Sequence, residues 1–231
     1  DRASSIPVDS FYLGELQRIE DFGDFKALEE KLESRALYGQ VKWQATQQGT
    51  FHLGARYEDY VSSGSAFSPR VTYVHRLNDN SQVKAIYSEA FRAPVTNELY
   101  SNDGVTLGNP DLKPELVNTS ELQYFYQGNR WSAEITAFYT RISQLIVSRP
   151  IDSGGRTQFR NEGKETVSGL ESLFNLQFND KLRLRFTATQ MITDTVEASY
   201  DRFATLGLFY HDTAWQFSLN TLWRPSVVIG E

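Results

Sequence analysis

Apolar and polar side chains alternate along most of this chain, and this period of two limits the possible folds more than any other feature. From Phe51 to Glu58 the odd positions are apolar and the even positions are polar or glycine. The run from Leu182 to Thr189 repeats the pattern with the parity reversed. Such alternation places apolar side chains on one face of a β-strand, whereas a helix needs a spacing of about three to four residues. The chain is therefore predicted to be all-β.

Ten strands are predicted, and the connections between them alternate in length. The short connections contain Gly, Asn or Asp, which tolerate the positive φ of tight hairpin turns. Longer connections are expected at residues 61–67, 92–115, 148–156 and 193–200. Short turns at one end and long loops at the other are typical of an antiparallel, up-and-down transmembrane β-barrel. The strands are expected near residues 35–47, 50–60, 68–77, 81–91, 116–127, 130–147, 157–178, 181–192, 201–211 and 213–223.

Composition excludes several classes of protein. The chain has 231 residues, no cysteine and a formal net charge of −6. Without cysteine there is no thiol catalysis, zinc finger or disulfide framework, and an acidic chain lacks the basic footprint of a nucleic-acid binder. No apolar run approaches the ~18 residues of a membrane-spanning helix. Because no catalytic or metal-binding motif is present either, we expect no enzyme, no metal site, no cofactor and no nucleic-acid partner.

The charge is concentrated at the N-terminal end. Residues 1–34 form an acidic loop or strand-connecting segment in this interpretation, with one or two helical turns between Asp24 and Glu33 as the alternative. Nine acidic and four basic residues lie before Ser34, so this segment carries −5 of the net charge of −6. Residues 35–231 are nearly neutral and form the predicted partial barrel.

The connection after the fourth strand contains two short motifs at a fixed spacing. The first is Phe91-Arg92-Ala93-Pro94, followed by Asn97-Glu98-Leu99-Tyr100. The second is Asn109-Pro110-Asp111-Leu112-Lys113-Pro114-Glu115. Together they resemble the FRAP and NPDLKPE boxes of TonB-dependent outer-membrane receptors, and Asn161-Glu162-Gly163 with Gly169-Leu170-Glu171 is also similar to barrel segments of that family. The resemblance covers about residues 35–223.

The resemblance implies a bacterial outer-membrane location and a barrel of about 22 strands around a plug. The chain then corresponds to the later half of such a barrel, with the plug domain absent and residues missing at both ends. Its expected partners are outer-membrane lipid, an extracellular ligand such as a ferric siderophore, and TonB, which acts through the missing N-terminal part. The implied function is TonB-dependent uptake of a scarce ligand.

Two interpretations of the loop remain open. In the first, both boxes shape the loop base, because Pro94, Pro110 and Pro114 remove backbone donors and restrict φ, and Arg92 and Glu115 at its two roots can form an ion pair. In the second, the segment from Val95 to Leu107 is part of an extracellular ligand mouth. Its candidate ligand contacts are Tyr100, Asn102 and Asp103.

Further candidate residues are two arginines on the polar face of one strand. Arg183 and Arg185 would point into a barrel lumen, where they could attract an anionic ligand or pair with carboxylates; we favour the pairing. Haem receptors of the family resemble one another in carrying a histidine between the two boxes. Residues 95–108 contain none, so a haem ligand is not expected there.

Two other functions are kept as alternatives. One is a passive porin or a surface barrel without energy coupling. The other is a soluble carbohydrate-binding β-sandwich, which predicts that the apolar face is covered by a second sheet. A partial barrel leaves two unpaired edge strands and an apolar outer band, so the isolated chain is expected to oligomerise or to require detergent.

Overall fold

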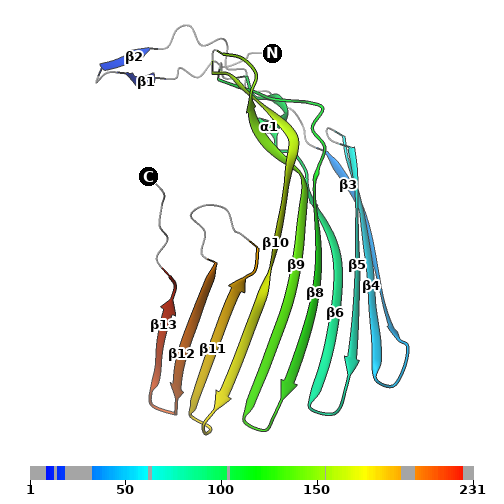
Figure 1. The fold of residues 1–231 in the computed structure, drawn as a ribbon, viewed down its shortest axis with the longest axis vertical. Helices are drawn as coiled ribbons and strands as arrows, with labels where there is room; N and C mark the ends of the chain where they lie inside the picture. The colour runs from blue at the N-terminus through cyan, green and yellow to red at the C-terminus, as the bar shows by residue number, and fades with distance from the viewer. Residues whose placement is uncertain are drawn as a thin grey trace.

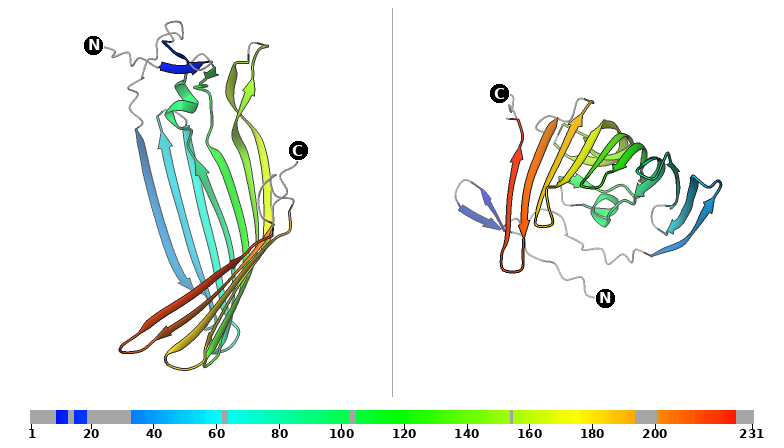
Figure 2. Two further views of the ribbon diagram at one scale, coloured as in Figure 1. Left: turned by 90° about the vertical axis from the view of Figure 1, so that its left-hand side faces the viewer. Right: turned by 90° about the horizontal axis from the view of Figure 1, so that it is seen from below.

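A computed structural model of the chain describes residues 9–12, 15–18, 33–61, 64–102, 105–153, 155–193 and 201–225. Its main feature is one large, curved sheet in which each long strand pairs antiparallel with the next along the chain (Figure 1). The sheet order is β13-β12-β11-β10-β9-β8-β6-β5-β4-β3, with β7 pairing to β10. Seen along the strands, the sheet is an open arc with α1 on its concave side (Figure 2, right).

All ten predicted strands are present, with ends shifted by a few residues. They are β3 (Ser34–Gln44), β4 (Gly49–Tyr60), β5 (Gly64–Arg76), β6 (Ser81–Arg92), β8 (Glu115–Gln127), β9 (Trp131–Pro150), β10 (Thr157–Gln177), β11 (Leu182–Met191), β12 (Arg202–His211) and β13 (Gln216–Trp223). The five short turns lie together at the lower end in Figure 1, which confirms the predicted two-ended arrangement.

Four elements were not predicted, and one loop is shorter than expected. A short helix, α1 (Thr96–Tyr100), and a two-residue strand, β7 (Thr106–Leu107), lie in the loop between β6 and β8. Within the predicted acidic segment, β1 (Asp9–Tyr12) and β2 (Glu15–Arg18) form an antiparallel hairpin, and residues 19–32, including most of the alternative helical turns, lie outside the described residues. The expected long loop at 61–67 is wrong, because the β4–β5 ladder continues to the pair Tyr60–Gly64.

The alternation predicted from sequence separates the two faces of the sheet. On the outer face, Phe51 lies between Trp43 and Tyr73, with ring centroids 5.6 and 4.6 Å away, close to a short turn. Trp131 stacks on Tyr126 at 4.4 Å in the same position along β8 and β9. Aromatic rows of this kind flank the apolar band of outer-membrane barrels.

The described residues have almost no buried apolar core. Only four hydrophobic residues are buried among them, namely Ala66, Ile86, Leu99 and Leu112. The other apolar side chains of the strands are exposed or half-buried, because no second sheet covers that face in the described part of the chain. A soluble β-sandwich would cover it, so the structure contradicts that alternative. No helix among the described residues is long and apolar enough to cross a membrane.

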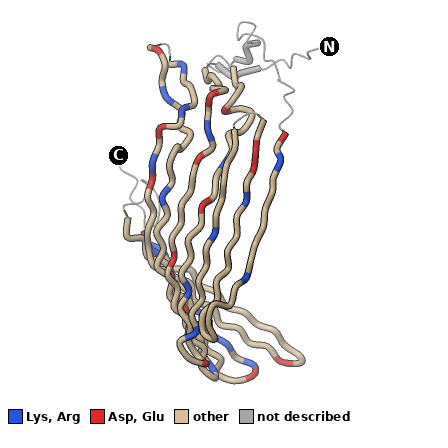
Figure 3. The backbone as a smooth tube through the Cα atoms, turned by 90° about the vertical axis from the view of Figure 1, so that its right-hand side faces the viewer, with Lys and Arg blue, Asp and Glu red and all other residues tan. Residues whose placement is uncertain are grey.

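The sheet ends on two open edges. β3 and β13 each pair on one side only, and every residue in both strands is exposed. Charged residues gather in the tall upper parts of β9 and β10 and at the short turns (Figure 3). The loop between β6 and β8 lies against these upper parts.

Candidate functional site

Arg92 and Glu115 close the base of the loop between β6 and β8. They are directly paired residues at the end of β6 and the start of β8. The Arg92 guanidinium donates from Nε to Oε2 of Glu115 and from Nη2 to Oε1, both at 2.7 Å. The predicted ion pair is therefore present, in the bidentate geometry that gives strong charge-assisted hydrogen bonds.

A second carboxylate completes this cluster. Glu98 of α1 accepts two hydrogen bonds of 3.0 Å from Nη1 and Nη2 of Arg92, and a third of 2.9 Å from the backbone N–H of Val95. Glu115 also accepts a 2.8 Å hydrogen bond from the N–H of Ile146 in β9. The Arg92 cluster, defined as Arg92, Glu98 and Glu115, thus joins β6, α1, β8 and β9.

The NPDLKPE box fastens the other side of the loop to β10. The Asn109 amide donates to the carbonyl of Phe159 at 3.0 Å, while the Asn109 N–H donates to the carbonyl of Glu98 at 2.8 Å. Lys113 and Asn161 exchange two hydrogen bonds of 2.8 Å through the Lys113 backbone. The NPDLKPE box therefore holds the backbone of the loop in place through the Asn109 side chain and the backbone peptide groups of Asn109 and Lys113.

Asn161 lies at an irregularity in the sheet. Its amide also donates to the carbonyl of Gln144 at 2.8 Å, and Gln144 adopts a left-handed φ of 56°. The β9–β10 register shifts on both sides of Gly163. A Cβ on Gly163 would lie 2.6 Å from the Cβ of Leu145, so glycine allows the strands to approach at this bulge.

Apolar packing fills the space between the two boxes. Leu99 is fully buried and Leu112 is 2% exposed, while Pro94 and Pro114 are also buried. Gly108 is required here, because a Cβ would lie 2.5 Å from the carbonyl oxygen of Leu99. These contacts favour the first interpretation, in which the boxes shape the loop base.

The mouth segment, Val95 to Leu107, is held above this base. β7 pairs parallel with β10 through Thr106 and Thr157, and the Gly108 N–H donates to the carbonyl of Ser101 at 2.6 Å. Tyr100 is half-buried and Asn102 is exposed in a bridge with Leu107. Asp103 lies outside the described residues. Tyr100 and Asn102 are thus close together on an anchored loop.

Arg183 and Arg185 lie elsewhere. They follow the short turn between β10 and β11, at the opposite end of the sheet from the mouth segment. Within the described part of the chain neither forms an ion pair, and the favoured pairing with carboxylates stays a prediction. The Arg183 guanidinium lies over the Phe209 ring, 5.1 Å from its centroid, which offers a cation–π contact in place of a carboxylate.

Sequence reasoning missed three contributors to this site. Glu98 belongs to the first motif, but α1, which places it opposite Arg92, is too short to produce a helical periodicity in the sequence. Asn161 and Gly163 were noted only as a family-like segment, although they anchor the second box. Among the described residues no cluster of three or more His, Asp or Glu side chains could hold a metal ion.

Comparison with known proteins gives a consistent result. The family model "TonB dependent receptor-like, beta-barrel" matches residues 17–227. The iron-regulated outer membrane virulence protein of Vibrio cholerae is 28% identical over 203 residues, covering 80% of this chain and 30% of that protein. A vitamin B12 transporter of Vibrio cholerae is 25% identical, covering 69% of this chain and 24% of the transporter.

Solved structures share the fold. A mutant of the ferric enterobactin receptor of Pseudomonas aeruginosa has a TM-score of 0.74 at 21% identity, covering 83% of this chain and 32% of that one. The siderophore receptor PirA of Pseudomonas aeruginosa has a TM-score of 0.71 at 22% identity, with 84% and 38% covered. The chain spans about a third or less of the length of the relatives it matches first.

Proposed function

Because this chain belongs to the TonB-dependent receptor family, as part of its outer-membrane β-barrel, we propose that the whole protein takes up a ferric siderophore from outside the cell. The family consists of receptors and transporters and is not known for enzymes. TonB and the energy for transport would act through the part of the protein that precedes these strands.

The anchored mouth segment is the observation that carries the proposal. The Arg92 cluster and the β7–β10 pairing fix both roots of a loop that carries the half-buried Tyr100 and the exposed Asn102. A loop held on a rigid scaffold is the usual location of ligand-selecting residues. Tyr100, Asn102 and Asp103 are the proposed ligand contacts, and the box residues act by positioning them.

The iron-containing ligand class is supported by the names of similar proteins. Relatives include an iron-regulated outer-membrane protein and a probable siderophore receptor, and the structural neighbours include ferric enterobactin and PirA receptors. A vitamin B12 transporter is also among the relatives, so cobalamin is the second candidate ligand.

Tryptophan fluorescence titration of the full-length receptor in detergent tests the ligand class. We expect saturable quenching by at least one ferric siderophore and none by cyanocobalamin. Tyr100→Ala and Asn102→Ala should weaken that binding by about tenfold each, the loss expected for a contact of ~1.4 kcal/mol. Thr213→Ala, in a short turn at the other end of the sheet, is the matched control.

Two results would contradict the proposal. Flat titrations against hydroxamate, catecholate and carboxylate complexes would remove the siderophore class, and saturation by cyanocobalamin would favour the second candidate. The passive alternative predicts steady ion conductance of the full-length protein in planar bilayers, whereas a plugged receptor should be closed.

A further inference from the structure

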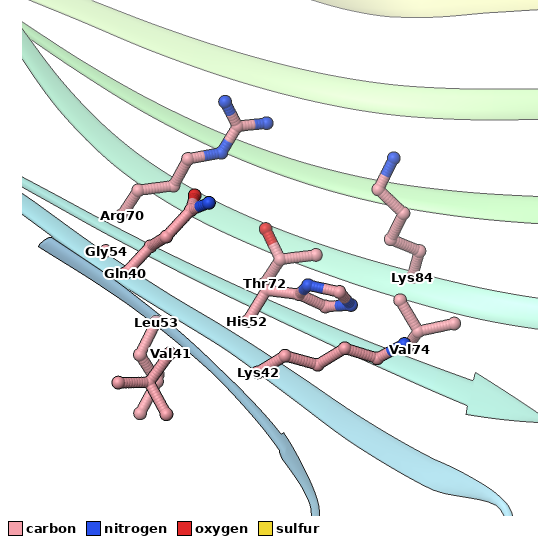
Figure 4. A pocket seen from close by; sticks show the side chains of 10 residues that line it. All are labelled: Gln40, Val41, Lys42, His52, Leu53, Gly54, Arg70, Thr72, Val74 and Lys84. Atoms are coloured by element: carbon pink, nitrogen blue, oxygen red, sulfur yellow. The ribbon is translucent and has the colours of Figure 1, made fainter.

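The outer face of the sheet carries two cations above its apolar band. Leu53, on this face, points to the opposite side of the sheet from Lys84 (Figure 4). The register leads from Leu53 across the sheet through one row of paired residues, namely Val71, Tyr87, Ser120 and Tyr139. Side chains alternate along a strand, so Arg141, which follows Tyr139 by two residues, is also on the outer face. Ser143 follows on the same face, and Lys164 lies opposite it in β10.

These cations lie at the upper limit of the apolar band. Below them the outer face of β9 carries Trp131, Ala133, Ile135, Ala137 and Tyr139. About ten residues separate Trp131, next to a short turn, from Arg141, and a barrel strand crosses the membrane with ~9–11 tilted residues. Short turns face the periplasm in such barrels. Arg141 and Lys164 are therefore at the level of the lipid headgroups of the outer leaflet.

Neither cation has a carboxylate partner at this level. Within the described residues the side chains of Arg141 and Lys164 form no ion pair and no hydrogen bond. The acidic residue in the row of Arg141 is Glu89, and Asn118 lies between them. Two strand spacings, about 10 Å, therefore separate Glu89 from Arg141, and Glu89 accepts a hydrogen bond from the Tyr87 hydroxyl.

Other parts of the barrel leave this position open to lipid. A plug would occupy the lumen, which is on the other face of the sheet. Further strands would join the open edges, β3 and β13, whereas β9 and β10 are inner strands of the sheet order. The next carboxylate along β10, Glu162, is paired with Arg149 and Arg160. The counter-charge for Arg141 and Lys164 is therefore sought in the membrane.

The two cations are close enough to hold one phosphate group. Arg141 pairs with Thr166, and Ser143 pairs with Lys164. Arg141 and Lys164 are thus diagonal neighbours in an antiparallel ladder, about 7–8 Å apart. A guanidinium binds two phosphate oxygens with its planar fork, and an ammonium adds a mobile point charge. The hydroxyls of Ser143 and Thr166 lie beside them on the same face and can donate further hydrogen bonds.

We propose that Arg141 and Lys164 bind the phosphate of a phosphorylated lipid in the outer leaflet. The exposed side chains of Ile135, Tyr139 and Leu170 lie below the two cations on the same face, where the acyl chains of that lipid would run. A free anion would gain nothing from this apolar surface. A lipid bound here would fasten the β9–β10 hairpin, and with it the loop between β6 and β8, at the membrane surface, whichever ligand the receptor carries.

Native mass spectrometry of the full-length receptor in detergent measures this binding directly. The probes are hexa-acyl lipid A with two phosphates and the same lipid after removal of both phosphates. Each cation near an anionic lipid surface contributes about fivefold to affinity. We therefore expect Arg141→Gln with Lys164→Gln to bind the phosphorylated lipid about 25-fold more weakly than the unchanged receptor, and to bind the phosphate-free lipid equally well.

Two further variants separate a specific site from general charge and from folding. Arg149→Gln with Arg160→Gln removes two cations from the same strands, above the membrane level, and should bind lipid like the unchanged receptor. Arg141→Lys with Lys164→Arg keeps both charges and should retain binding to within about threefold, since Lys lacks the planar fork of Arg. Far-ultraviolet circular dichroism shows whether each variant has the β-content of the unchanged receptor.

Three results would overturn the inference. One is equal affinity of the unchanged receptor for the two lipids, and another is an equal loss of lipid binding in Arg149→Gln with Arg160→Gln. The third is saturable binding of inorganic phosphate that Arg141→Gln with Lys164→Gln abolishes, because it would assign the two cations to a free anion. No siderophore enters this assay, so flat siderophore titrations would overturn the proposed function and leave the lipid result unchanged.

Discussion

Replacing Arg92 by alanine should loosen the base of the loop without unfolding the barrel. Glu115 would keep one of its three hydrogen bonds, from Ile146, and its side chain is only 9% exposed. Breaking a buried ion pair costs about 3–5 kcal/mol. The Arg92 side chain is 43% exposed, so water can partly replace it, and we expect about 2–4 kcal/mol. Arg92→Lys keeps the charge but loses the bidentate fork, and should cost less.

Hydrogen exchange of the full-length receptor measures this loosening at named amides. The Val95 N–H donates to Glu98 and the Ile146 N–H to Glu115. When exchange reports the local opening free energy, 2–4 kcal/mol corresponds to roughly 30- to 700-fold faster exchange. Arg149→Ala is the matched control, since its ion pair with Glu162 is half-exposed on both sides and contributes about 0–1 kcal/mol.

Either of two results would refute this reasoning. One is an exchange rate at Val95 and Ile146 of Arg92→Ala that stays within threefold of that in the unchanged receptor. The other is an equally large acceleration of exchange in the control Arg149→Ala. A double-mutant cycle of Arg92→Ala and Glu115→Gln should also give a coupling energy well above the ~0.5 kcal/mol expected of independent sites.

The remaining predictions concern the bulge, the second box and one short turn. Gly163→Ala should cost about 1–3 kcal/mol in urea unfolding because its Cβ would overlap Leu145, whereas Gly39→Ala, with nothing within 4 Å, should not destabilise; equal midpoints would contradict the close approach. Asn161→Ala removes three hydrogen bonds and, at about 1 kcal/mol each, should make proteolysis of the loop between β6 and β8 clearly faster; an unchanged cleavage rate would show that the second box does not depend on it. Hydrogen bonds from the Ala214 N–H, the Tyr210 hydroxyl and the Trp215 N–H lower the pKa of Asp212 below 3.8. The stabilisation they give is therefore present above the unfolded pKa and is lost as the pH falls through the folded value, so exchange protection of Ala214 should disappear in that acid range in the receptor; Asp212→Asn should abolish this pH dependence, and protection that persists to lower pH would contradict it.

The strands were predictable because their signal is local. A period of two over eight or more residues, bounded by Asn, Asp or Gly, requires nothing from the rest of the chain. The prediction of a long loop at 61–67 was wrong because it also relied on local signal. The ladder between β4 and β5 continues through residues such as Ser65 that carry no strand pattern of their own.

The site was only partly predictable, because its contacts join distant residues. The Arg92–Glu115 pair could be proposed, since both residues stand at strand ends flanking one loop. Asn161 lies 48 residues from Lys113 in sequence, and nothing in either local segment indicates their contact.

The pairing order of the sheet has a consequence for how stability is shared. Every long ladder joins strands that are neighbours in sequence, so each hairpin depends mainly on the two beside it, much as units do in a repeat protein. The loop between β6 and β8 is different, because its contacts reach β9 and β10 as well. It links strands that the sheet alone would leave independent, so a disturbance at the loop should spread to four strands, while one in a short turn should remain within its hairpin.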